Sequence, residues 1–157
     1  MDWDTFFMSL VYLVAMKSKD TSTHVGCVIV NDDNVIKSVG YNGFPRGIDD
    51  SIEERYTRPN KHFFTEHAER NAIYNAETSL SGCRAYVNFM PCALCTRALM
   101  QVGIKEIVVH TSFAESYQNN GYDDSHRAAY EMLQEKGIKI THWNGSIVDR
   151  ITGLAGG

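Results

Sequence analysis

Two short groups of residues in this sequence could carry out chemistry. His67 and Glu69 are separated by a single residue, and Cys92 and Cys95 form a C-x-x-C pair directly after Pro91. One nitrogen and two sulfur ligands leave the fourth position of a tetrahedral zinc ion open, which is the arrangement of a catalytic zinc site. Such a zinc lowers the pKa of its bound water, and a carboxylate beside that water can move protons. The spacing therefore predicts a hydrolytic zinc site with His67, Cys92 and Cys95 as ligands and Glu69 as the proton carrier.

Each group also has a simpler interpretation when it is taken alone. A C-x-x-C pair is common in structural zinc sites and redox pairs, and H-A-E is common in exposed helices. A structural zinc site needs a fourth cysteine or histidine ligand, ideally as part of a second pair. The remaining candidates form no second pair at the usual spacing: Cys27, Cys83, His24, His62 and His110. The two groups together favour the catalytic site.

The elements that must position these groups follow from hydrophobic periodicity. Helices are predicted over residues 2–17, 66–78, 92–102 and 124–136, and strands over residues 25–30, 35–41, 84–89, 104–110 and 138–141. Both ligand groups open helices, with Thr65 as the expected N-cap of one and Pro91 before the other. This order predicts an α/β fold, a three-layer α/β/α arrangement around a five-stranded mixed sheet. The two helix N-termini can meet along one edge of such a sheet.

Length and charge limit the classes of protein that this chain can represent. Its 157 residues fit a single domain, residues 1–157, and a net charge of −4 argues against a general nucleic-acid binder. The first apolar stretch is interrupted by Lys17 and Lys19 and is too short to cross a membrane. The first four residues are acidic overall where a signal peptide would be basic, and in a cytosolic protein four cysteines indicate metal ligands or reduced thiols more than disulfides. We therefore expect a cytoplasmic protein without membrane or nucleic-acid partners.

The sequence resembles the deoxycytidylate (dCMP) deaminase family within the cytidine deaminase superfamily. The H-x-E and P-C-x-x-C signature is that of zinc deaminases. The resemblance extends over residues 23–30, the G-Y-N-G-F-P-R-G segment at 40–47, residues 67–73 and residues 102–105. It implies a cytidine deaminase-like fold, one catalytic Zn²⁺ and hydrolysis of dCMP to dUMP and ammonia, supplying dUMP for thymidylate synthesis. It also implies a homo-oligomer, a hexamer in many members.

The resemblance further implies roles for individual residues. Ala68 is expected to offer backbone groups to the pyrimidine, and Asn42 to hydrogen-bond the sugar. Tyr41, Asn42 and Gly43 match the segment at which dCTP activates and dTTP inhibits family members with the help of Mg²⁺. The substrate phosphate requires a cation, preferably a guanidinium. The candidates are Arg46 and Arg97, together with Arg55, Arg58 and Lys61 in the charged segment 49–64.

Two other readings stay open at this point. The same zinc chemistry could act on a nucleoside, guanine, a riboflavin precursor, a modified dCMP or a tRNA adenosine, although the negative net charge counts against tRNA. Alternatively, the chain could be a non-catalytic, zinc-stabilised binding module. An aromatic loop with Phe113, Tyr117 and Tyr122 could close over a bound base or pack on the sheet edge.

Overall fold

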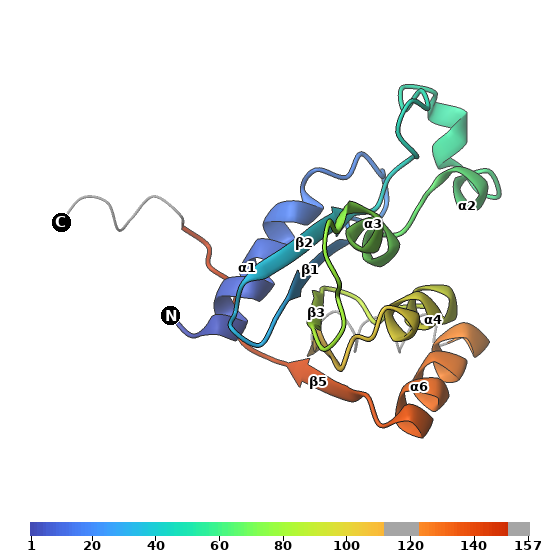
Figure 1. Cartoon of the computed structure of the whole chain (residues 1–157). Coiled ribbons are helices and arrows are strands. Elements are labelled where there is room, and N and C mark those ends of the chain that lie inside the picture. The colour runs from blue at the N-terminus through green and yellow to red at the C-terminus, as the bar shows by residue number, and fades with distance from the viewer. Residues whose placement is uncertain (112–122, 151–157) are drawn as a thin grey trace.

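The structure, a computed structural model, describes residues 1–111 and 123–150. Its centre is a five-stranded sheet with the order β2-β1-β3-β4-β5 (Figure 1). The strands are β1 (Gly26–Val30), β2 (Ile36–Tyr41), β3 (Arg84–Val87), β4 (Glu106–His110) and β5 (Lys139–Trp143). β1 is antiparallel to β2 and β3, whereas β3, β4 and β5 are parallel. The predicted mixed sheet is confirmed. The aromatic loop predicted around Tyr117 lies outside the described residues.

Helices cover both faces of this sheet. Helix α1 (Trp3–Ala15) packs on one face, where its Phe7 and Val11 meet Val28 of β1. On the other face lie α3 (Ala68–Asn75), α4 (Ala93–Gln101) and α6 (Asp124–Lys136). Alternate residues of a strand point to opposite faces, so every residue of β1 is buried between the two helical layers. The predicted three-layer arrangement is therefore confirmed.

The charged segment between β2 and α3 contains two short helices that the sequence pattern did not predict. A 3₁₀ helix spans Glu53–Tyr56, and α2 spans Lys61–Phe64; α2 lies to one side of the sheet in Figure 1. Aromatic contacts hold the segment together, since Phe44 stacks on Tyr56 with ring centroids 4.5 Å apart. No helix in the described parts of the chain is both long and apolar enough to cross a bilayer.

Helix α3 begins later than predicted, and this difference matters for the site. Thr65 is not its N-cap; His67 is, with extended backbone angles (φ −79°, ψ 153°). The chain stays extended up to this point because Glu66 pairs with Gly43, the Glu66 amide donating at 2.8 Å and the Gly43 amide at 3.1 Å. This backbone pairing competes with helix formation over residues 65–66. His67 therefore stands at the helix start, at the edge of the sheet.

Gly40 on β2 allows α3 to pack closely against the sheet. A Cβ at Gly40 would lie 2.3 Å from the backbone nitrogen of Ala72 and 2.4 Å from the carbonyl oxygen of Ala68. Ser38, two residues earlier on the same strand, donates a hydrogen bond to the carbonyl of Ala72. The helix that carries His67 and Glu69 is therefore seated directly on the β2 backbone.

Candidate metal centre and catalytic cavity

The two ligand groups meet because their helices start at the same edge of the sheet. β2 and β3 are each antiparallel to β1 and so run in the same direction as one another. The chain leaves each strand at that edge and then forms α3 or α4. His67 is the N-cap residue of α3, Cys92 is that of α4, and Cys95 lies in the first turn of α4. The carboxyl ends of strands that share a direction are a common location for ligand sites in α/β folds.

The three side chains form a group of the size that a zinc ion requires. His67 Nδ1 lies 3.6 Å from Cys92 Sγ and 3.4 Å from Cys95 Sγ. Tetrahedral zinc, with Zn–N near 2.0 Å and Zn–S near 2.3 Å, separates a nitrogen and a sulfur ligand by about 3.5 Å. All three ligand atoms lie within 4.8 Å of one another, and no fourth histidine, cysteine or carboxylate joins them among the described residues. The donor set therefore fits zinc with one coordination position open.

Electrostatics around the two thiols favours cation binding. A hydrogen bond from the Cys95 thiol lowers the pKa of Cys92 to about 3, and a hydrogen bond from His67 makes a smaller contribution in the same direction. The same contact, together with burial, raises the pKa of Cys95. Arg70 donates to Cys95 Sγ at 3.4 Å and is itself held by the carboxylate of Glu66. Sequence reasoning missed Arg70; its position one turn after the N-cap histidine was the available signal.

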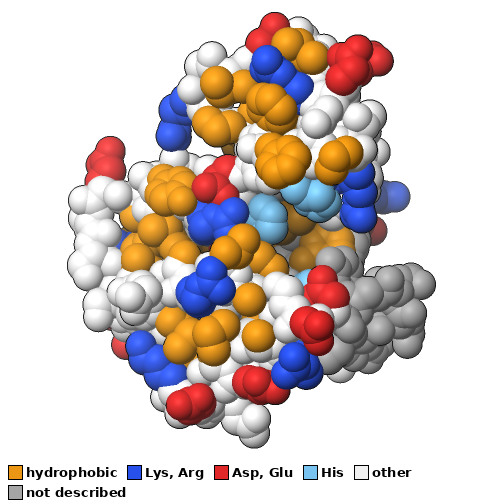
Figure 2. All heavy atoms as spheres, turned by 90° about the vertical axis from the view of Figure 1, so that its right-hand side faces the viewer, with side chains coloured by type: hydrophobic (Ala, Val, Ile, Leu, Met, Phe, Trp, Pro, Cys, Tyr) orange, Lys and Arg blue, Asp and Glu red, His pale blue; other side chains and the backbone are white. Residues whose placement is uncertain are grey.

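Glu69 lies beside the metal ligands in a cavity of about 320 Å³ that His67 and Cys92 also line. Its residue surface is only 4% exposed, and burial raises the pKa of its carboxyl. The space-filling view shows histidine side chains gathered in a hollow on this face, between an upper and a lower part of the molecule (Figure 2). A raised pKa and access to the cavity suit a carboxyl group that both takes up and releases protons.

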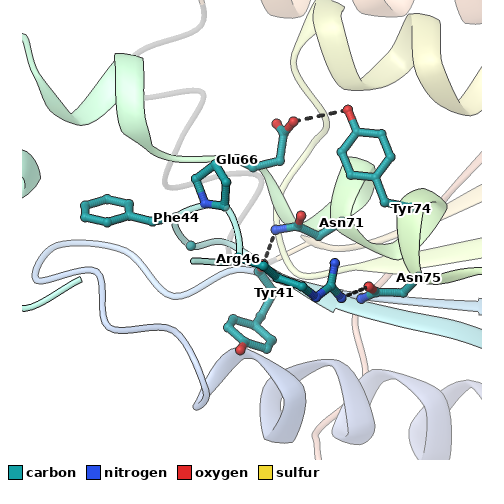
Figure 3. Close-up of a pocket in the computed structure, with 9 residues that line it drawn as sticks. Tyr41, Phe44, Arg46, Glu66, Asn71, Tyr74 and Asn75 are labelled. Atoms are coloured by element: carbon teal, nitrogen blue, oxygen red, sulfur yellow. Dashed lines mark hydrogen bonds between the residues drawn. The ribbon is translucent and has the colours of Figure 1, made fainter. Parts of the chain in front are cut away.

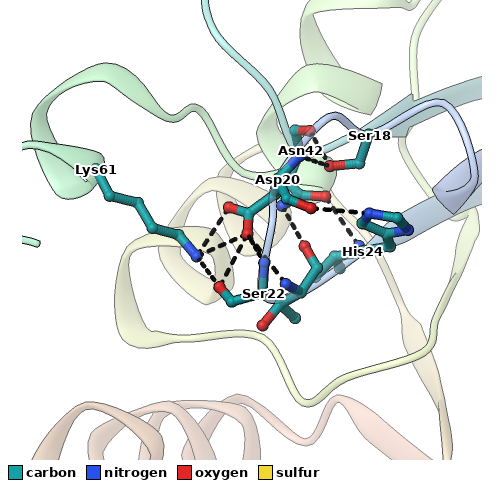
Figure 4. A network of polar contacts seen from close by, with 8 residues as sticks. Ser18, Asp20, Ser22, His24, Asn42 and Lys61 are labelled. Carbon is teal, nitrogen blue, oxygen red and sulfur yellow. Dashed lines mark hydrogen bonds and ion pairs between the residues drawn. The ribbon is translucent and has the colours of Figure 1, made fainter. Parts of the chain in front are cut away.

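Asn42 and Ala68, expected from the family resemblance to contact substrate, line the same cavity. Asn42 is 6% exposed; its amide oxygen accepts from the Val25 amide at 2.9 Å, and its amide nitrogen donates to the Thr23 carbonyl at 2.9 Å. Figure 4 shows Asn42 within this network, with Ser18 donating to its backbone carbonyl. An amide has two donor and two acceptor positions, so one of each is left for a ligand.

The three residues expected at a regulatory nucleotide site, Tyr41, Asn42 and Gly43, do not line the same cavity. Tyr41 and Gly43 line a separate pocket of about 240 Å³, whereas the buried Asn42 between them faces the metal cavity. Arg46 lines this second pocket and donates to the Asn75 side chain (Figure 3). Alternation of side-chain direction at the end of β2 explains the division.

Neither of the two foremost phosphate candidates borders the metal cavity. Arg46 belongs to the second pocket, and Arg97 is exposed on α4. The cavity is instead bordered by Arg58 and Lys61 of the charged segment, and by Asp123 and His126 at the start of α6. The last two were missed, because they lie far along the chain and carry no pattern beyond that of a helix cap.

A model of the cytidine and deoxycytidylate deaminase zinc-binding region matches residues 1–111 of this sequence. The chain belongs to this deaminase family. Among relatives, it is 38% identical over 139 residues to the deoxycytidylate deaminase of Homo sapiens, covering 85% of this chain and 74% of that one. It is 44% identical over 105 residues to a probable deoxycytidylate deaminase of Caenorhabditis elegans, a match that covers 64% of this chain and about half (53%) of that protein.

Solved structures of the deaminase family show the same fold. The apo crystal structure of dCMP deaminase from the cyanophage S-TIM5 superimposes with a TM-score of 0.68 at 22% sequence identity. The superposition covers 89% of this chain and 96% of that one. The family resemblance seen in the sequence motifs is thus confirmed by the relatives, and the fold by the structures.

Proposed function

We propose that this chain is a zinc-dependent deoxycytidylate deaminase, a hydrolase that converts dCMP and water into dUMP and ammonia. The observation that carries the proposal is the buried Glu69, which lines one cavity together with His67 and Cys92. The deoxycytidylate deaminases among the relatives support dCMP as the substrate. A proton-carrying group beside an open metal position is what hydrolytic deamination requires.

In this mechanism His67, Cys92 and Cys95 hold the zinc ion. When bound, zinc supplies Lewis-acid activation of a water molecule near neutral pH. Glu69 accepts a proton as the water oxygen forms its bond to C4 of cytosine, and it passes the proton to the ring nitrogen. Glu69 then takes the proton of the hydroxyl group at C4 and donates it to the amine as the C4–N bond breaks, so that ammonia leaves and a C4 carbonyl remains. Burial raises the pKa of the Glu69 carboxyl, which favours its uptake of the proton from the water.

We assign the pyrimidine to the backbone of Ala68 and the sugar to Asn42. Ala68 is the first residue of α3, where backbone N–H groups have no partner within the helix. Asn42 retains free amide positions beside the same cavity. Contacts of this kind would hold the base against Glu69 and the metal ligands.

Ultraviolet absorbance tests the activity directly. Zinc-loaded protein is mixed separately with dCMP, dCTP, deoxycytidine, cytidine, CMP and guanine, and the deamination signal is expected to be strongest with dCMP. Glu69→Gln should lower kcat by at least about 100-fold, the usual contribution of general acid–base catalysis, while its zinc content stays equal to that of the parent protein. Turnover of dCMP at the parent rate by this variant would refute the role of Glu69. The absence of a deamination signal with all of these compounds would favour a non-catalytic module.

We also propose that nucleotide triphosphates regulate the enzyme through the second pocket. Tyr41, Gly43 and Arg46 line it, so a turn backbone and a guanidinium are available for a Mg²⁺-bound dCTP or dTTP. Saturating dTTP should shift the dCMP saturation curve and dCTP should reverse the shift. An unchanged curve with both nucleotides would remove this proposal.

The assembly is proposed to be a homo-oligomer, a hexamer by family resemblance, in the cytoplasm. Large apolar side chains are exposed on α3 and α4, with Tyr74 at 60% and Leu94 at 54%. Exposed apolar residues of this kind are common at subunit contacts. Light scattering after gel filtration measures the mass, and a monomer at micromolar concentration would contradict the assignment.

A further inference from the structure

The cavity that holds Glu69 has a deep end and an exposed rim. Glu69 and Ala68 are buried, whereas Arg58 and His62 on its border are exposed. A nucleotide whose base reaches Glu69 must direct its phosphate towards this rim, because the phosphate is its most strongly hydrated part. At about 320 Å³, the cavity lies within the usual range for sites that bind small molecules.

Most charged groups on the border of the cavity already have partners. Lys61 forms an ion pair with Asp20 at 2.8 Å. Asp123 accepts from the ring Nδ1 of His126 at 2.8 Å and from its backbone amide at 3.1 Å. Among the described residues that border the rim, Asp123 is the carboxylate, and His126 faces its charge. Arg58 forms no hydrogen bond or ion pair with any residue in the described parts of the chain.

The segment that carries Arg58 is fixed to the rest of the site by Lys61. Besides its ion pair with Asp20, the Lys61 ammonium donates to the hydroxyl of Ser22 at 2.6 Å (Figure 4). Asp20 is held in turn by the amides of Ser22 and Thr23, at 2.8 and 3.0 Å. The loop before β1 and the segment around α2 are therefore tied together at the rim, three residues from Arg58.

A second polar atom in this segment lacks a partner. The hydroxyl oxygen of Thr65 is buried, forms no hydrogen bond within the described structure, and belongs to a residue that lines the same cavity. An unsatisfied buried hydroxyl is costly unless a ligand or water occupies the position beside it. The hydroxyl itself is enclosed by protein, whereas Arg58 is exposed at the cavity border.

We propose that Arg58 recognises the 5′-phosphate of the substrate and so makes the enzyme select a nucleotide over a nucleoside. This inference rests on the proposed function, because the deamination reaction places the base at Glu69. A guanidinium binds phosphate through two parallel hydrogen bonds, which an ammonium cannot reproduce. Arg58 is thus a specificity-determining residue supplied by the segment that Lys61 holds in place.

Steady-state kinetics with dCMP and deoxycytidine test the assignment. Arg58→Ala should raise KM for dCMP by about 10- to 100-fold, the range for a charge-assisted hydrogen bond, with little change in kcat. The KM for deoxycytidine should stay within twofold. Arg58→Lys should recover part of the loss. Arg150→Ala, which removes an exposed positive charge away from the cavity lining, serves as the matched control. Equal losses for the two substrates, or no loss for dCMP, would overturn the proposal.

Binding of the reaction product separates this proposal from the assigned activity, because it needs no turnover. Calorimetry with dUMP and deoxyuridine should show that Arg58→Ala weakens binding of dUMP alone. A parent protein that binds dUMP through Arg58 without deaminating dCMP would refute the proposed function and keep this inference. A parent protein that binds dUMP no more weakly after Arg58→Ala would refute the inference, whatever its activity.

Discussion

Lys61 holds a buried carboxylate, and its replacement with methionine should be among the more destabilising single changes outside the core. The Asp20 side chain is only 3% exposed and that of Lys61 only 15%. Three hydrogen bonds reach Oδ1 of Asp20 from Ser22 and Thr23, at 2.8, 2.9 and 3.0 Å. Oδ2, in contrast, has no hydrogen-bond partner in the described structure beyond its ion-pair contact with the ammonium. Lys61→Met leaves that oxygen buried and uncompensated.

The expected cost follows from these contacts. Removing one partner of a fully buried ion pair destabilises a protein by about 3–5 kcal/mol. The three hydrogen bonds that remain on Oδ1 compensate part of the charge, so we expect the free energy of unfolding to fall by about 2–3 kcal/mol. For a domain of this size, that change lowers Tm by about 4–12 °C. Lys19→Met is the matched control, because Lys19 pairs with Asp50 at 2.8 Å while both side chains are well exposed, at 66% and 45%. Its loss should cost about 1 kcal/mol or less.

Urea unfolding of zinc-loaded proteins at equal concentration measures these differences, and Asp20→Asn completes a double-mutant cycle. Equal stability of Lys61→Met and Lys19→Met, or additive single changes, would refute the reasoning.

The pH dependence of this ion pair has a definite sign. In the parent protein burial raises the pKa of Asp20, but the bonds from Lys61, Ser22 and Thr23 outweigh it and hold that pKa below 3.8. Its contribution is therefore present above about pH 4 and lost as pH falls through the folded pKa. Loss of the Lys61 contact removes one cause that lowers the pKa of Asp20, so this pKa should be higher in the variant than in the parent protein. The deficit of the variant should therefore be largest at pH 7 and shrink as pH falls.

Three further changes test the construction of the site. Cys92→Ala removes a sulfur ligand and should abolish stoichiometric zinc binding, as measured by metal analysis; full zinc content would contradict the ligand set. Arg70→Leu removes the donor 3.4 Å from Cys95 Sγ and should weaken zinc binding by about 10- to 100-fold, as measured by competition with a chelator. An unchanged affinity would show that this contact does not contribute to zinc binding. Gly40→Ala places a methyl group 2.3 Å from a backbone nitrogen of α3 and should cost about 1–3 kcal/mol in urea unfolding, together with lower kcat as Glu69 shifts. Parent stability in this variant would show that α3 is not seated as described.

Much of the fold was predictable, because its elements have strong local patterns. The helix over residues 124–136 was predicted with the bounds that α6 has, since Asp123 caps its start and Gly137 ends it with a positive φ of 77°. The sequence of elements along the chain and the two helical layers followed from β-branched runs alternating with amphipathic segments, whereas the order of the strands within the sheet came from the structure. The start of α3 was wrong, because the pairing of Gly43 with Glu66 is a long-range interaction that no local pattern reveals.

The charged segment shows the limit of local patterns most clearly. Residues 49–64 read as irregular, and their cations could not be ranked from the sequence. The structure separates them: Arg55 lies over the ring of Phe64 at 4.7 Å, Lys61 is committed to Asp20, and Arg58 stands at the cavity. The ranking depends on contacts between residues up to 41 positions apart.

The sequence by itself determined the chemistry: a histidine, a C-x-x-C pair and a neighbouring glutamate select zinc and proton transfer, because ligand type and spacing are local properties. Only the tertiary structure decided which groups share the metal cavity. Asn42 and Tyr41 are adjacent in the chain and face different pockets, whereas Arg58 and Asp123 are distant in the chain and border one cavity. The physical reason is that several elements pack together to enclose a cavity. The direction of the side chains on each element depends on how that element packs against the sheet.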